Sequence, residues 1–73
     1  MDKNIYKKTG AVLKKARKQK NLTLEDVAKI MGKSKSWIGD IESGRNRIYF
    51  DDILKLCELY EADIDDIAKQ VDN

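Results

Sequence analysis

Apolar residues along the chain recur at intervals of three and four, the spacing that places side chains on one face of an α-helix. This pattern predicts five short helices, at residues 5–20, 23–31, 34–43, 50–61 and 63–71, and no segment alternates as a strand does. The residues expected to face inward are Leu13, Ala16, Arg17 and Lys20 in the first helix, Leu24, Val27, Ala28 and Met31 in the second, Ile38 and Ile41 in the third, Ile53, Leu56, Cys57 and Tyr60 in the fourth, and Ile64 and Ile67 in the fifth. The pattern therefore predicts an all-α fold.

Polar residues and glycines mark the ends of the second and third helices. Thr23 and Asp26 form a Thr-x-x-Asp capping signal at the start of the second helix, and Ser34 can cap the third. Gly32 and Gly44 follow the last turns of these two helices, where a left-handed residue is often needed. We therefore expect two short helices joined by a tight turn.

The fourth predicted helix carries the widest apolar stripe. Leu54 and Leu59 extend it beyond half of the circumference, so we expect this helix to lie at the centre of the fold. Alternatively, Leu54, Leu59, Tyr60 and Val71 offer surplus apolar surface for contact with a second copy of the chain. Cys57 is interpreted as a small core residue rather than a redox sensor.

The chain has 73 residues, enough for one small domain. No proline, repeat or Gly/Ser-rich linker divides it, so we expect residues 1–73 to form a single domain. A core of this size stabilises a fold by roughly 3 to 5 kcal/mol, which requires compact local packing. The prediction is a compact domain of five helices.

The net charge of +2 conceals a strong asymmetry. Residues 1–47 carry a net charge of +8, whereas residues 48–73 carry −6. A basic first part indicates a polyanionic partner such as nucleic acid. The alternative is a solvated surface whose charge is merely uneven.

Several kinds of chemistry are excluded by composition. With one cysteine and no histidine, the chain offers no disulfide, no thiolate or imidazole metal cage and no Ser/His or Cys/His catalysis. We expect no metal, no cofactor and no small-molecule ligand. Because no apolar run is long enough to span a bilayer and residues 1–10 lack the apolar segment of a signal peptide, we expect a soluble, cytoplasmic protein without membrane association.

The second and third helices, with Gly32 in the turn, have the form of a helix-turn-helix over about residues 23–43. The wider pattern resembles the lambda-repressor/Cro-like (XRE-type) helix-turn-helix family over about residues 9–68. The matching residues are Leu13, Arg17, Leu22, Thr23, Val27, Ala28, Gly32, Ser34, Ile38, Ile41, Glu42, Gly44 and the segment 63–67. The resemblance implies a five-helix, lambda-repressor-like DNA-binding domain whose recognition helix, residues 34–43, enters the major groove.

If Ile38 and Ile41 face inward, then the outer row of the third helix comprises Lys35, Ser36, Gly39 and Asp40. Lysine can donate to guanine, serine to several base edges, and aspartate can accept from cytosine N4. The family carries base contacts at the positions of Lys35, Ser36 and Asp40. Gly39 costs about 1 kcal/mol in mid-helix relative to alanine, which close approach by DNA or another helix would explain.

Each outer residue has another interpretation. Lys35 can be a solvated charge, and Ser36 a polar residue of the first helical turn. Asp40 is repelled by phosphates, so it can equally pair with Arg45 or Arg47, or serve to reject wrong sequences. Base reading by Asp40 stays open.

Phosphate contacts are expected around the recognition helix. The candidates are Thr23, Lys33, Ser34, Trp37, Ser43, Arg45, Asn46, Arg47 and Tyr49. Arg45 and Arg47 are preferred because no nearby helical acid obviously pairs with them, although they can be ordinary loop charges. Trp37 is either a half-buried packing residue or an indole donor to a phosphate.

Arg17 and Glu42 are expected to form a structural ion pair. Both lie at inward positions, where a half-buried carboxylate requires a cation, and the family commonly clamps these helices with such a pair. Two separate surface charges are the alternative. The sequence departs from the family pattern at Leu24, where a phosphate-binding glutamine is usual, at Ile48, where proline is customary, and at Tyr49, where serine typically caps.

These features predict a small bacterial or phage-type transcriptional regulator, a repressor, that binds double-stranded operator DNA as a homodimer at half-sites about 34 Å apart. The alternative is a protein-interaction module, such as an antitoxin or accessory subunit, that uses the same basic face. An enzyme is not expected. The paired acids at 51–52 and 65–66 stand at helix starts, where they complement the helix dipole.

Overall fold

The computed structural model describes residues 3–72 of the chain, with side chains from residue 5 onward. It contains five helices and, within this range, no strand: α1 (Lys3–Gln19), α2 (Leu24–Met31), α3 (Lys35–Ser43), α4 (Phe50–Leu59) and α5 (Ile64–Asp72). The predicted all-α fold is confirmed, and the predicted helix boundaries agree with the structure to within two residues. Residues 1, 2 and 73 of the expected single domain lie outside the described range.

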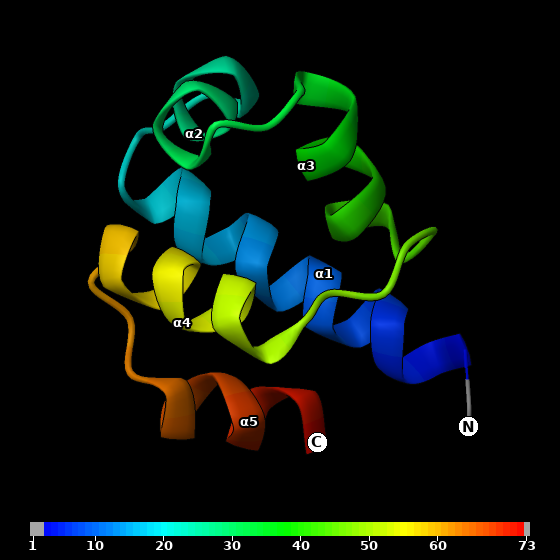
Figure 1. The fold of residues 1–73 in the computed structure, drawn as a ribbon. Helices are drawn as coiled ribbons and strands as arrows, with labels where there is room; N and C mark the ends of the chain where they lie inside the picture. Colours follow the sequence, from blue (N-terminus) through cyan, green and yellow to red (C-terminus); the bar gives the residue numbers. More distant parts are fainter. Residues whose placement is uncertain (1–2, 73) are drawn as a thin grey trace.

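Helix α1 occupies the centre of the fold, which corrects the expectation that residues 50–61 would do so. It packs against α3 on one side and α5 on the other, and Figure 1 shows it crossing the middle of the molecule between the α2–α3 pair and the α4–α5 pair. The core cluster takes Leu13 and Ala16 from α1, Val27 and Ala28 from α2, Ile38 and Ile41 from α3, and Leu56 and Tyr60 from the α4 region. Every helix before α5 therefore contributes to one core.

The caps of α2 and α3 form as the sequence predicts. The Thr23 hydroxyl accepts from the Asp26 amide at 3.0 Å, and the Asp26 carboxylate accepts from the Thr23 amide at 2.9 Å. These hydrogen bonds lower the pKa of Asp26, and the bond from the Thr23 backbone has the largest effect. The Ser34 hydroxyl accepts from the Trp37 amide at 3.0 Å. Because side chains satisfy these amides, the starts of both helices are fixed.

Glycine is required at two places where α1 meets α3. A Cβ atom on Gly10 would lie 2.5 Å from the carbonyl oxygen of Glu42, so α1 can approach the end of α3 only with glycine there. Gly44 has φ = 80°, and a Cβ on it would lie 2.7 Å from the side chain of Lys7. The orientation of α3 on α1 thus depends on two glycines.

Two sequence-based expectations are wrong in detail. Lys20 does not face the core; it is exposed and pairs with Glu61, and that hydrogen bond lowers the pKa of Glu61. Leu54 is 43% exposed and therefore does not belong to the core stripe of α4. Tyr60 is only 3% exposed, which confirms its predicted inward position and contradicts the alternative that it offers surplus surface. Cys57 is buried as expected, and burial raises the pKa of its thiol.

Candidate nucleic-acid interface

The inner row of α3 is fixed by an ion pair with α1. The Arg17 guanidinium donates from Nε to Glu42 Oε2 at 2.7 Å and from Nη2 to Oε1 at 3.0 Å, while Nη1 donates to the Leu22 carbonyl at 2.7 Å. The side chains of Arg17 and Glu42 are 8% and 7% exposed. The hydrogen bond with Glu42 raises the pKa of Arg17, against the opposing effect of burial. This bidentate pair ties α1, the loop before α2 and α3 together.

The outer row of α3 lines a shallow groove, which we call the α3 groove. Its walls are Leu24, Lys35, Ser36, Gly39, Asp40, Ser43 and Arg45. Lys35 and Ser36 are exposed, and Gly39 and Asp40 are partly exposed. All four residues predicted to face bases therefore share one concave surface, and Leu24 joins them from the start of α2.

Gly39 has no packing role within the chain. A Cβ atom added there would meet no atom within 4 Å, in contrast to Gly10 and Gly44. Its φ is not left-handed, since Gly32 and Gly44 are the positive-φ glycines of the described range. The fold therefore gives no reason for the helix-weakening glycine at this position.

Two acidic residues pair with cations along the α3 groove. Glu25 Oε1 lies 3.6 Å from Lys35 Nζ, and Asp40 Oδ1 lies 3.8 Å from Arg45 Nη1. The second pair corrects the expectation that no helical acid pairs with Arg45, and it realises one of the alternatives for Asp40. The role of Glu25 was not predicted. Helical periodicity cannot predict a contact between Glu25 and Lys35, because the two residues lie on different helices.

The predicted phosphate contacts fall into two groups. The hydroxyls of Thr23 and Ser34 already cap helices, and that of Ser43 donates to the Asp40 carbonyl at 3.2 Å. Trp37 is half-buried against the core, with the Lys33 ammonium 5.2 Å from its ring centroid. The exposed group comprises Lys33, Arg45, Asn46, Arg47 and Tyr49. Of these residues, Ser43 and Arg45 line the α3 groove.

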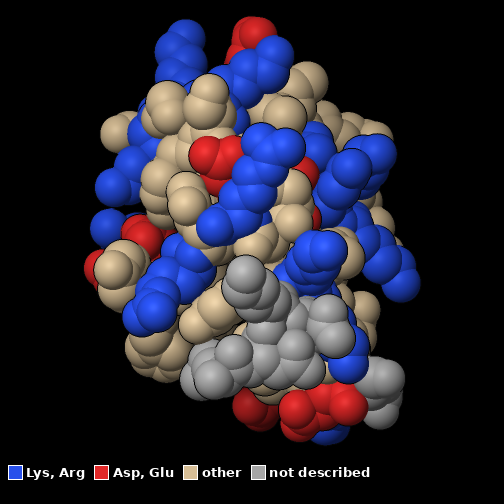
Figure 2. Space-filling view, turned by 90° about the vertical axis from the view of Figure 1, so that its right-hand side faces the viewer, with Lys and Arg blue, Asp and Glu red and all other residues tan. Residues whose placement is uncertain are grey.

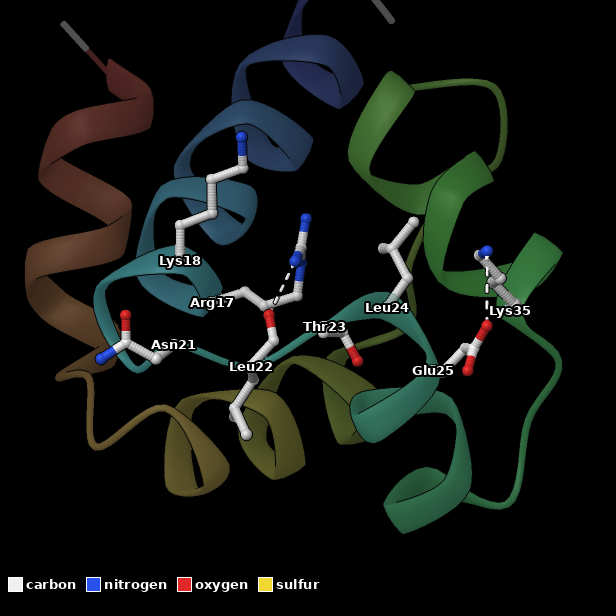
Figure 3. Close-up of a pocket in the computed structure, with 8 residues that line it drawn as sticks. All are labelled: Arg17, Lys18, Asn21, Leu22, Thr23, Leu24, Glu25 and Lys35. Carbon is white, nitrogen blue, oxygen red and sulfur yellow. Dashed lines mark hydrogen bonds and ion pairs between the residues drawn. The ribbon is translucent and has the colours of Figure 1, made fainter.

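A second hollow lies at the start of α2, where α1, α2 and α3 approach one another. Arg17, Lys18, Thr23, Leu24, Glu25 and Lys35 are among the residues that line it. Figure 3 shows the Glu25 and Lys35 side chains turned toward each other across this hollow, with Leu24 beside them. Lys18 is a further cation on this surface.

Basic residues predominate on the side of the molecule that carries α3 and the loop after it. Figure 2 shows Lys and Arg atoms over the upper and middle parts of this side, with a few acidic atoms among them and a larger acidic group at the lower edge. The asymmetry of charge along the sequence is thus also visible on the surface. Within residues 3–72, no helix is both long enough and apolar enough to cross a membrane.

The fold and this surface together define a helix-turn-helix protein, in which α2 braces an α3 whose outer face is open. Residues 9–70 match the model of a family described as a helix-turn-helix domain, and the chain belongs to that family. The resemblance to XRE-type helix-turn-helix proteins is thereby confirmed. Such a family typically consists of DNA-binding proteins rather than enzymes.

One curated relative is similar to part of the chain. The ImmF control region 10 kDa protein of Bacillus phage phi105 is 46% identical over 39 residues, which make up 53% of this chain. The matched segment covers 43% of that phage protein, less than half of its length. The relative supports an XRE-like family.

Proposed function

We propose that this chain is a transcriptional regulator, acting as a repressor, that binds double-stranded DNA through a single helix-turn-helix domain. The observation that carries the proposal is the division of α3. Its inner residues Ile38 and Ile41 are buried and Glu42 is paired with Arg17, whereas its outer row lines an open groove. Family membership and the name of the phage relative support the same function.

In this proposal residues 34–43 enter the major groove. Lys35 donates to guanine, Ser36 contacts a neighbouring base edge, and Asp40 accepts from cytosine N4 once Arg45 has turned to a phosphate. Gly39 lets the helix approach the bases closely, which supplies the reason that packing does not.

Phosphates are bound on both sides of the recognition helix. Lys33 and the loop residues Arg45, Asn46, Arg47 and Tyr49 supply exposed side chains, and Ser43 and Trp37 lie between them. Thr23 and Ser34 contribute through the amide-rich helix starts that they cap, since their hydroxyls are engaged within the chain. Leu24 cannot replace the hydrogen bond of the glutamine that is usual at its position.

The experiment that tests this function selects DNA from a pool of randomised duplexes and measures the affinity of the selected sequence at several salt concentrations. We expect a defined motif and a slope of log K against log salt of about −0.9 for each phosphate neutralised. Arg45→Ala should weaken binding to all duplexes and reduce that slope by about one. Lys35→Ala should remove the preference at one base pair, a loss of about 1–3 kcal/mol of discrimination.

Lys69→Ala is the matched control, because Lys69 is an exposed cation on α5 in the acidic part of the chain. It should leave both the motif and the salt slope nearly unchanged. Binding that shows no sequence preference and no response to Arg45→Ala or Lys35→Ala would instead favour a protein-interaction module.

A further inference from the structure

Glu25 is an exposed acid that neither packing nor helix capping explains. It lies in the first turn of α2, but the capping box is formed by its neighbour Asp26 with Thr23. Its side chain is 77% exposed and lies 3.6 Å from the Lys35 ammonium. The Lys35 side chain is itself 61% exposed. A pair this exposed adds little to stability, typically below about 1 kcal/mol.

The location of Glu25 is unfavourable for a protein that binds DNA. Its carboxylate stands at the start of α2, beside the amides proposed to face a phosphate, in a hollow that it shares with the cations Arg17, Lys18 and Lys35. A carboxylate there repels every duplex, whatever its sequence. Glu25 complements the dipole of α2 from its first turn, but Asp26 in the same turn already does so and also caps the helix. The cost of Glu25 for DNA binding therefore calls for a further, functional reason.

The contact with Lys35 supplies that reason. A lysine side chain has four flexible bonds, so an ammonium that is free in solution loses much freedom when it binds a base. The Glu25 carboxylate holds this ammonium at the wall shared by the α3 groove and the hollow at the start of α2, which Lys35 and Leu24 both line. Because an ammonium has three donors, Lys35 can keep Glu25 and donate to guanine O6 and N7 as well.

We infer that Glu25 is a specificity-determining residue that positions Lys35 toward guanine and opposes binding to duplexes that lack guanine at that place. The inference rests on the proposed function and deepens it. On a matching duplex, the repulsion by Glu25 is offset by an oriented Lys35. On other duplexes, the repulsion has no such compensation, so non-specific affinity falls more than specific affinity.

Glu25→Gln tests the inference, measured on the selected duplex, on its single-base variants and on a random duplex. We expect the affinity for the random duplex to rise about fivefold, as for removal of one like charge near a surface. The preference for the guanine that Lys35→Ala identifies should fall by a similar factor. The thermal midpoint should stay within one or two degrees of wild type, because the pair is exposed.

Glu58→Gln is the matched control, since Glu58 is an exposed acid on α4, away from the α3 groove, and the change in net charge is the same. A double-mutant cycle with Lys35→Gln then shows whether Glu25 acts through Lys35. In the Lys35→Gln background, Glu25→Gln should no longer alter base preference.

Three results overturn the inference. The first is an equal gain of affinity on all duplexes, of the size given by Glu58→Gln. The second is a change in base preference that persists without Lys35. The third is a wild-type protein with no sequence preference at all, which overturns the proposed function too. The first two results reject only the role of Glu25, because the wild-type protein still selects a motif.

Discussion

At the scale of single residues, polar side chains divide into those that the fold uses and those that it leaves open. Arg17 and Glu42 are buried and satisfy each other, so removing one partner would leave an uncompensated charge in the interior. Lys35 and Arg45 hold only long, exposed contacts with acids, which leave donors of both side chains available to DNA. Burial and distance thus separate structural charges from binding charges.

Tyr60 gives a prediction about alkaline pH. Burial, followed by the charge of Glu42, raises the pKa of Tyr60 from 10.0 to about 12, although Arg17 acts in the opposite direction. In the unfolded chain the phenol ionises near pH 10, while in the folded chain it stays protonated. The free energy of unfolding should therefore fall between pH 10 and pH 12, by up to about 1.4 kcal/mol per pH unit from this group.

Urea unfolding at pH values from 8 to 11 measures this effect, and Tyr60→Phe is the control. Other groups also titrate in this range, so the informative quantity is the difference between the two proteins. Below pH 10 the difference should be constant, and above pH 10 the wild type should lose stability faster than Tyr60→Phe. Parallel curves would show that the Tyr60 phenol does not contribute.

At the scale of elements, the sequence predicts much of this structure because the signals are local. The capping box at Thr23, the cap at Ser34 and the left-handed residues Gly32 and Gly44 fix the helix ends, with φ values of 67° and 80° at the two glycines. Burial of individual positions was less predictable. Lys20 and Leu54 follow helical periodicity, but which part of a wide stripe meets a neighbour depends on packing between helices.

The candidate site shows the same limit. The outer row of α3 follows from helical geometry once Ile38 and Ile41 are placed inside. The pairs Glu25–Lys35 and Asp40–Arg45 do not, because each depends on the angle at which two segments meet. Gly10 was likewise overlooked, since its importance lies in its contact with the carbonyl oxygens of α3.

Two glycine-to-alanine substitutions should have opposite effects on stability. Gly39→Ala meets no atom within 4 Å, so it should stabilise the fold by up to about 1 kcal/mol through helix propensity. The same methyl group should weaken binding to the selected duplex, because it fills the α3 groove. Gly10→Ala should destabilise the fold, since its Cβ would overlap the backbone of α3.

Urea unfolding and duplex binding measured on the same samples check this prediction. Gly10→Ala serves as the contrast, because Gly10 does not line the α3 groove. We expect this variant to lose stability but to keep its affinity per folded molecule at low temperature. A Gly39→Ala protein that is both more stable and fully active would argue against close approach of DNA at this position.

At the scale of the whole molecule, burial removes one of the residues expected at a contact between two copies. Tyr60 is buried and unavailable, whereas Leu54, Tyr49 and Phe50 are 43%, 66% and 66% exposed. Tyr49 and Phe50 directly follow the basic loop after α3, and Leu54 lies one turn beyond Phe50. Because Tyr49 is assigned to phosphate, we name Phe50 and Leu54 the α4 apolar patch and propose it as the contact of a homodimer on DNA.

The dimensions of the molecule fit this arrangement. Its longest extent is 29 Å, and half-sites one helical turn apart are centred about 34 Å from each other. With the longest axis along the duplex, two copies on one face of the DNA would come close at their edges. Since the α4 apolar patch follows the end of the recognition helix, contact there would bring two recognition helices into adjacent stretches of the major groove.

The double substitution Phe50→Ser and Leu54→Ser should therefore separate dimer binding from half-site binding. We expect about tenfold weaker binding to a palindromic operator, as for loss of a central apolar anchor, and nearly unchanged binding to an isolated half-site. The changes add no charge, so the salt slope on the half-site should be unaltered. Gel-shift titration of both duplexes provides the measurement, with the free energy of unfolding as a check on folding.

Ile30→Ser is the control, because Ile30 is 60% exposed on α2 and lies outside the patch. Equal losses for Ile30→Ser and for the double variant would place the contact elsewhere, and equal affinity of wild type for the operator and the half-site would mean that the protein binds as a monomer.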